Sequence, residues 1–76
     1  MDFVIEEGER IIALEVKCSA LKELRLGKSA RSFIEAYRPE SFAVLNMTLE
    51  REIEGEHCPV SFITPSGLQE WLAVER

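Results

Sequence analysis

The sequence lacks several features that would place it in a specialised class of protein. It has no apolar run approaching the roughly 20 residues of a membrane-spanning helix, and its start, MDFVIEEGER, lacks the basic region of a secretory signal peptide. It has only two cysteines, Cys18 and Cys58, and no CxxC pair. We therefore expect a cytoplasmic protein that does not associate with membranes, whose two thiols are free and mostly buried.

Signatures of nucleotide and zinc binding are also missing. No GxxxxGK[ST] phosphate loop occurs, so we expect no ATPase module in this chain. The single histidine, His57, has neither a second histidine nor a CxxC pair with which to form a zinc site. No repeat, linker or low-complexity stretch divides the 76 residues, of which 46% are hydrophobic and 30% are charged. The sequence thus predicts one small folded domain over residues 1–76.

Basic residues are scarce except in one segment. The net charge of −5 argues against a general nucleic-acid binder. Residues 17–31, however, hold five of the 9 Lys and Arg residues and one of the 14 acids. Such a segment could contact phosphates, and we expect the nucleic-acid-binding residues to be Lys22, Arg25, Lys28 and Arg31. The alternative is an ordinary solvated loop followed by the start of a helix.

Hydrophobic periodicity predicts an α/β (α+β) domain with a small mixed sheet and the element order β-β-α-β-β-α. The first two strands form a hairpin around Gly8. A helix of about ten residues follows, with Ser29 as its N-cap and Pro39 as its stop, and it is expected to cover the apolar face of the sheet. The next strand, within residues 41–47, is expected to run parallel to the strand that precedes the helix.

The second half of the chain is predicted to end in a strand and a helix. Residues 48–57 are acidic, and their alternating glutamates suit an exposed strand or a hairpin arm with a turn at Gly55. A short strand over residues 60–63 leads to Thr64 and Pro65, an N-cap followed by proline at the first helical position. Trp71 lies on the apolar side of the closing helix, where a core or interface role is expected.

The parity of the first hairpin decides which charged residues share a face. Side chains alternate along a strand, so Glu15 and Lys17 point the same way. A two-residue turn at residues 8–9 places Asp2 opposite Glu15, and a turn at residues 7–8 keeps both acids on that face. Only a turn of odd length would separate them. The other face is expected to be apolar and to carry Phe3, Ile5, Ile12, Leu14 and Val16.

Two carboxylates and a lysine on one face suit the binding of a divalent cation beside a phosphodiester. The carboxylates of Asp2 and Glu15, together with a backbone carbonyl such as that of Val16, can hold Mg²⁺ with waters completing its octahedron. Lys17 can position a water or neutralise phosphate charge. The alternative is a face open to solvent, on which Glu15 and Lys17 are ordinary exposed charges.

These residues carry a resemblance to a known family. The segments DFVIE (residues 2–6) and ALEVK (residues 13–17) resemble the core motif of the PD-(D/E)XK nuclease superfamily. More narrowly, together with FIEAYRP (33–39), FAVL (42–45) and ITP (63–65), they are similar to the C-terminal domain of unknown function found in archaeal and bacterial AAA-type ATPases. This resemblance covers essentially the whole chain. It implies a restriction-endonuclease-like fold, metal ligands at Asp2 and Glu15, a catalytic lysine at Lys17, and an AAA-type ATPase as a partner.

The chain also departs from the superfamily pattern. Members of the superfamily normally carry a helix and one more strand before the motif aspartate, whereas this chain begins one residue ahead of Asp2. We therefore expect an N-terminally truncated restriction-endonuclease-like core, with uncovered sheet surface that favours a homodimer. Two functions remain open. The first is a Mg²⁺-dependent nuclease acting on DNA, and the second is a catalytically silent module that binds protein or nucleic acid.

Overall fold

The chain opens with a hairpin whose turn is formed by Gly8 and Glu9. The structure, a computed structural model, describes residues 1–75. Strand β1 (Phe3–Glu7) pairs antiparallel with β2 (Arg10–Val16). Gly8 has a φ of 64°, a backbone conformation that glycine adopts without steric cost, and Glu9 has a negative φ. A positive φ at the first central position alone is the pattern of a type II′ hairpin turn, and the predicted two-residue turn is confirmed.

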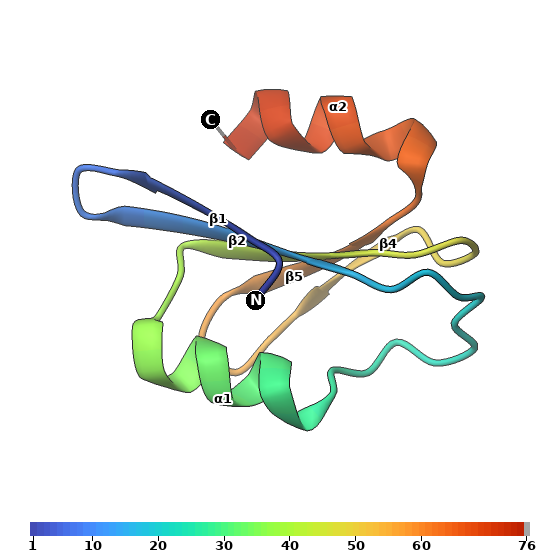
Figure 1. Cartoon of the computed structure of the whole chain (residues 1–76), viewed down its shortest axis with the longest axis horizontal. Coiled ribbons are helices and arrows are strands. Elements are labelled where there is room, and N and C mark those ends of the chain that lie inside the picture. Colours follow the sequence, from blue (N-terminus) through green and yellow to red (C-terminus); the bar gives the residue numbers. More distant parts are fainter. Residues whose placement is uncertain (76) are drawn as a thin grey trace.

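Three further strands extend the hairpin into a five-stranded mixed sheet (Figure 1). Strand β3 (Ser41–Leu45) runs parallel to β2, as predicted, and β5 (Pro59–Ile63) runs parallel to β3. Strand β4 (Arg51–Glu54) pairs antiparallel with β5 and forms the second edge of the sheet, in the order β1-β2-β3-β5-β4. The predicted element order is therefore one strand short, because the acidic segment forms a ladder strand of its own.

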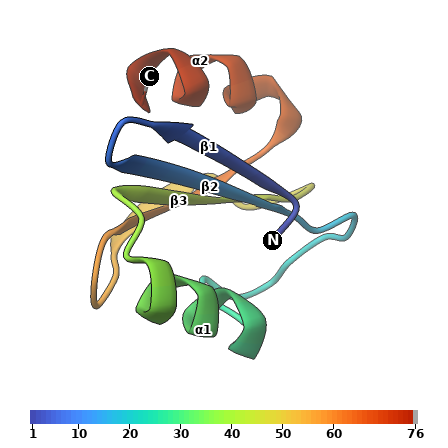
Figure 2. The same cartoon turned by 60° about the vertical axis from the view of Figure 1, so that its left-hand side comes forward.

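The two helices lie on opposite faces of the sheet (Figures 1 and 2). Helix α1 (Lys28–Tyr37) has Gly27 at its N-cap, so the predicted cap at Ser29 is wrong. It ends where Arg38 takes a left-handed conformation and donates its backbone N–H to Ile34, and Pro39 then prevents its continuation, as predicted. Helix α2 (Pro65–Glu75) begins at the expected proline.

Each helix covers its own core. The cluster beneath α1 is formed by Ala13, Ala30, Ile34, Phe42, Val44, Cys58, Val60 and Phe62. The cluster beneath α2 is formed by Ile12, Leu14, Ala43, Ile63 and Trp71, with Ile5 packed against it. The apolar face of the hairpin is thus covered by the second helix, and the prediction that the first helix covers it is wrong. Both faces of β2 are buried, because Ala13 on the α1 side is fully enclosed.

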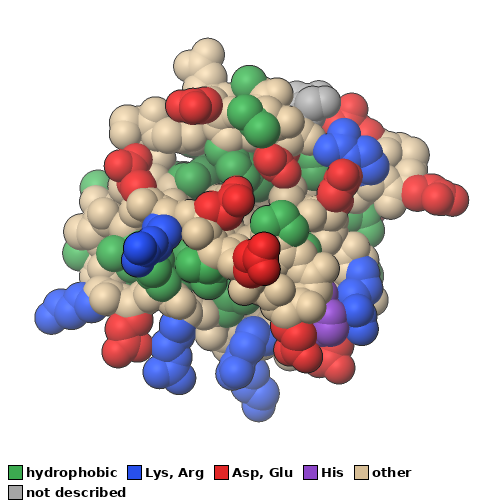
Figure 3. Space-filling view, turned by 180° about the vertical axis from the view of Figure 1, so that it is seen from behind, with side chains coloured by type: hydrophobic (Ala, Val, Ile, Leu, Met, Phe, Trp, Pro, Cys, Tyr) green, Lys and Arg blue, Asp and Glu red, His purple; other side chains and the backbone are tan. Residues whose placement is uncertain are grey.

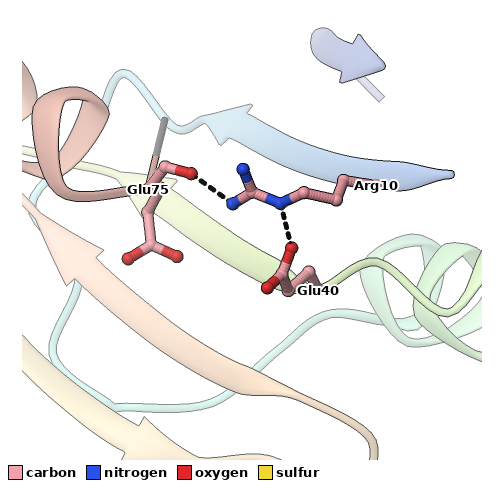
Figure 4. Close-up of polar contacts among 3 residues, drawn as sticks. All are labelled: Arg10, Glu40 and Glu75. Carbon is pink, nitrogen blue, oxygen red and sulfur yellow. Dashed lines mark hydrogen bonds and ion pairs between the residues drawn. The ribbon is translucent and has the colours of Figure 1, made fainter. Parts of the chain in front are cut away.

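Arg10 joins three parts of the chain that are distant in sequence. Its guanidinium donates hydrogen bonds to the carboxylate of Glu40, which follows α1, and to the backbone carbonyl of Glu75 in α2 (Figure 4). The backbone N–H of Glu40 donates in turn to Ile11 at 2.8 Å. The hydrogen bond to Glu40 raises the pKa of Arg10. This cluster holds the start of β2 against the ends of both helices.

Asn46 closes the end of β3 with its side chain. The residue is 1% exposed, and its amide nitrogen lies within hydrogen-bond distance of the carbonyls of Val44, Leu49 and Ile63, at 3.1 to 3.3 Å. Its amide oxygen accepts the backbone N–H groups of Thr48 and Leu49. These contacts bind the backbone of the turn toward β4 and satisfy the buried amide of Asn46 itself.

Within residues 1–75, neither helix is both long and apolar enough to cross a membrane.

Replacing Gly8 with alanine is expected to lower the free energy of unfolding by about 1–2 kcal/mol, because an L-residue disfavours left-handed backbone. The matched control is Gly27→Ser. Gly27 has a φ of −75° and open space around an added Cβ, so a serine N-cap there should change stability by only a few tenths of a kcal/mol. Urea unfolding measures both variants. Equal stability of Gly8→Ala and the parent chain would contradict the assigned turn.

Replacing Asn46 with aspartate is expected to lower the free energy of unfolding by about 2–3 kcal/mol or more, because a carboxylate cannot donate to the surrounding carbonyls. The neighbouring control is Met47→Ala. Met47 is exposed, so this change should stay within about 0.5 kcal/mol. Chemical denaturation of the two variants side by side tests the difference. Similar losses at both positions would show that the Asn46 hydrogen bonds contribute little.

Candidate functional site

The hairpin places the two predicted acids at paired positions where its strands end. The ladder pairs Phe3 with Leu14, and this register places Asp2 opposite Glu15. The Oδ2 atom of Asp2 accepts the backbone N–H of Val16 at 2.7 Å, which ties the start of the chain to β2. The predicted two-residue turn and the register it sets are therefore confirmed, and a shared site of the two carboxylates stays a prediction. Glu15 shares its face of β2 with Ala13 and therefore points toward α1, whereas Asp2 precedes β1 and its carboxylate bonds the backbone of β2.

Glu15 and Lys17 form an ion pair along the end of β2. The Nζ atom of Lys17 lies 3.2 Å from Oε1 of Glu15, and their side chains are 45% and 14% exposed. Glu15 sits beside the buried Val44 in the parallel ladder, so its carboxylate is largely removed from water. A largely buried carboxylate needs a partner, which Lys17 provides. Because the lysine is half-exposed, it can also reach other groups.

A hollow of about 300 Å³ opens beside this pair, between the end of β2 and the start of α1. We call it the Lys17 hollow. Its charged lining consists of Glu15, Lys17, Arg25, Lys28 and Arg31, so four cations face one carboxylate. Three of the four residues predicted to bind nucleic acid thus line the same space as the predicted lysine. Lys22 is exposed but does not line the hollow.

The irregular connector between β2 and α1 carries part of this lining. Residues 18–26 form neither helix nor strand, and two contacts hold the segment against the end of β3. The backbone N–H of Met47 donates to Ser19 at 3.1 Å, and Oγ1 of Thr48 donates to the carbonyl of Leu21 at 2.7 Å. Both donors lie in the turn that Asn46 organises. The packing at the end of β3 therefore positions the connector that carries Arg25.

The donor set around Asp2 and Glu15 fits a hard cation. Carboxylate and carbonyl oxygens are the ligands that Mg²⁺ takes in proteins, and Mg²⁺ usually keeps several waters beside one or two carboxylates. Within residues 1–75, no three His, Cys, Asp or Glu side chains converge as a metal cluster. The candidate ligands accordingly remain the pair Asp2 and Glu15, with the carbonyl of Val16 adjacent in sequence.

A second hollow, of about 390 Å³, lies between α1 and the turn that joins β4 to β5. We call it the His57 hollow. Lys28 and Arg31 line it as well, and they therefore separate it from the Lys17 hollow. Seen from behind, Lys and Arg side chains gather along the lower edge of the molecule, where α1 lies, with acids among them and the histidine toward one end (Figure 3). Sequence reasoning missed this site because only the tertiary fold brings α1 and residues 55–58 together.

Two local features shape the wall of the His57 hollow. A Cβ added at Gly55 would lie 2.5 Å from the carbonyl oxygen of Cys58, so the tight turn over residues 55–58 requires glycine there. Nη1 of Arg38 lies 2.8 Å from Nδ1 of His57. A guanidinium can only donate, so Nδ1 accepts and the imidazole proton resides on Nε2. The sequence signal for this site was the lone histidine beside Cys58.

Comparison with known proteins gives no significant match to a family model, a curated protein or a solved structure. The resemblance to the PD-(D/E)XK superfamily accordingly stays a prediction.

The two thiols differ in exposure. Cys58 is buried, as expected, and burial raises the pKa of its thiol because the thiolate loses hydration. Cys18 is exposed, so the expectation that both thiols are mostly buried is wrong for this residue. It follows β2 at the start of the connector, where no helix covers it.

At pH 7.5 we expect a thiol-specific chromogenic disulfide to react rapidly with Cys18 and with Cys58 only after unfolding. Burial raises the pKa of Cys58 above its ordinary value of 9.0 in the folded state. The neutral buried thiol therefore contributes its full share of stability below pH 9.0, and that share is lost as the pH rises through the raised pKa. Cys18→Ser should remove the rapid phase, and Cys58→Ser should leave it. Rapid reaction of both thiols in the native protein would contradict the burial of Cys58.

Proposed function

We propose that this chain is a metal-dependent nuclease core that hydrolyses phosphodiester bonds of DNA. The observation that carries the proposal is the ion pair of Glu15 and Lys17 beside a hollow lined by further cations, with Asp2 at the position opposite Glu15 in the hairpin register. The carboxylates provide ligands for a divalent ion, and the cations provide partners for a phosphate at the same place. The proposal includes a restriction-endonuclease-like core with Mg²⁺ as its cofactor.

The residues of the chain have separate roles in this proposal. Asp2, Glu15 and the carbonyl of Val16 would hold the ion, which when bound supplies Lewis-acid polarisation of a phosphoryl oxygen. Lys17 donates to a non-bridging phosphate oxygen and offsets the charge that develops there. Arg25, Lys28 and Arg31 hold the substrate backbone, and the two guanidiniums can each bind a phosphate through two parallel hydrogen bonds. Lys22 extends this basic surface outside the hollow.

The proposal also includes a cellular location and partners for the chain. A cytoplasmic location and an AAA-type ATPase partner follow from the resemblance and from the composition of the chain. A homodimer is supported by the apolar surface of the edge strand β1, on which Phe3 is 59% exposed and Val4 is also exposed.

A second candidate is a catalytically silent module that binds nucleic acid or protein. One observation favours it. Asp2 and Glu15 already have partners within the chain, namely the N–H of Val16 and the ammonium of Lys17. Both carboxylates are thereby satisfied by protein groups alone, so the fold does not require a cation at this position.

A Mn²⁺ titration followed by backbone amide NMR, combined with a Mg²⁺-dependent cleavage assay on labelled DNA, tests the choice. The nuclease predicts selective broadening at Asp2, Glu15 and Val16 that Glu15→Gln abolishes. It also predicts that Lys17→Ala lowers the cleavage rate by roughly 100- to 1,000-fold while the protein stays folded.

Glu54→Gln is the matched control, since it removes one exposed carboxylate from the distant strand β4. It should leave both the broadening and the cleavage unchanged. Broadening confined to residues 50–56, or none, together with no cleavage, would overturn the nuclease and support the silent module.

A further inference from the structure

The His57 hollow combines an apolar base with a polar rim. Ile34, Cys58 and Val60 are buried side chains that line it, and they provide a surface without charge. The rim carries Lys28, Arg31, Glu35, Glu56 and His57. At about 390 Å³ the hollow falls within the range of roughly 300–1,000 Å³ that is typical of small-ligand sites.

The charges on the rim decide what kind of group fits. Two cations are balanced by the carboxylates of Glu35 and Glu56, so a phosphate placed inside would meet like charges. Carboxylates accept hydrogen bonds from exocyclic amino groups. The Nε2–H of His57 is available as a donor, since Arg38 occupies Nδ1. An apolar base with both acceptors and a donor at its rim suits a flat heteroaromatic ring such as a nucleobase.

The position of the two cations adds a second constraint. Lys28 and Arg31 are three residues apart on α1 and therefore lie on one face of the helix. They line both the His57 hollow and the Lys17 hollow, so the two spaces share a wall of positive charge. A nucleic-acid strand matches this arrangement. When one base occupies the His57 hollow, the backbone crosses the two cations and the next phosphate reaches the Lys17 hollow.

We propose that the His57 hollow binds one unpaired nucleobase of a nucleic-acid strand whose backbone crosses Lys28 and Arg31. A base inside a duplex has its edge occupied by its partner and its faces stacked, so only an unpaired or extruded base can enter. The site thus selects single-stranded substrate. The inference rests on the proposed function in one respect, namely that the strand continues into the Lys17 hollow.

The test measures binding without cleavage, in the presence of EDTA. Fluorescence anisotropy compares a labelled single-stranded DNA oligonucleotide with its duplex, with an abasic strand of equal length, and with the RNA version. We expect the single strand to bind about tenfold more tightly than the duplex and the abasic strand. The RNA comparison shows which sugar the site accepts.

Two serine variants on α1 provide a matched pair. Ser32→Leu fills the His57 hollow from its rim, whereas Ser29 is also exposed on the same helix and lines neither hollow. Ser32→Leu should remove the tenfold preference for bases, and Ser29→Leu should retain it. Backbone amide NMR with a nucleoside monophosphate should show shifts at Gly55, His57 and Cys58 that ribose 5-phosphate does not produce.

The outcomes separate this inference from the nuclease proposal. A preference for bases that depends on Ser32, without Mg²⁺-dependent cleavage, would support the base site and overturn the nuclease. Equal binding of the abasic and natural strands, with cleavage intact, would overturn the base site and leave the nuclease in place. Nucleotide-induced shifts around Glu15 and Lys17 only would likewise overturn the base site.

Discussion

The candidate site depends on the even number of residues in the turn of the first hairpin. Two turn residues pair β1 with β2 so that Asp2 falls opposite Glu15, and the parallel ladder then places Glu15 beside Val44. One inserted residue in that turn would send the two acids to opposite faces. The same insertion would move an apolar side chain of β1 away from the core beneath α2. The packing of the hairpin and the geometry of its charges are therefore enforced together.

Hydrogen-bonding side chains fix the ends of the strands in place. Asn46 accepts hydrogen bonds from the backbone of the turn after β3. That turn then donates a hydrogen bond to the connector that carries Arg25. Arg10 performs a related task at the opposite end of β2, where it joins Glu40 to the carbonyl of Glu75. In a domain of this size the apolar core alone gives a thin margin of stability. Such polar anchors fix the ends of the elements, where the candidate residues lie.

Local rules predicted those features that depend on neighbours in sequence. The pairing of Asp2 with Glu15, the end of α1 before Pro39 and the start of α2 at Pro65 all follow from turn length or proline chemistry. The predicted element order did not count β4 as a separate strand, although its alternating glutamates suited an exposed strand or hairpin arm, because its ladder comes only from pairing with β5. The face that each helix covers could not be predicted either, because β2 is buried on both faces. The His57 hollow depends on contacts between α1 and residues 55–58, which no periodicity reveals.

The connector between β2 and α1 has a thermodynamic consequence for recognition. No backbone amide of residues 18–26 donates to a backbone carbonyl within the described part of the chain. The segment is held through the carbonyls of Ser19 and Leu21 and through the packing of its leucines against the core beneath α1. A segment without backbone ladder hydrogen bonds depends on side-chain packing for its protection from local opening. Lys22 and Arg25 therefore lie on an irregular segment, beside the helix that carries Lys28 and Arg31. In the proposed nuclease, a strand bound at Lys22 and Arg25 would lose as much affinity as the connector loses conformational entropy on binding.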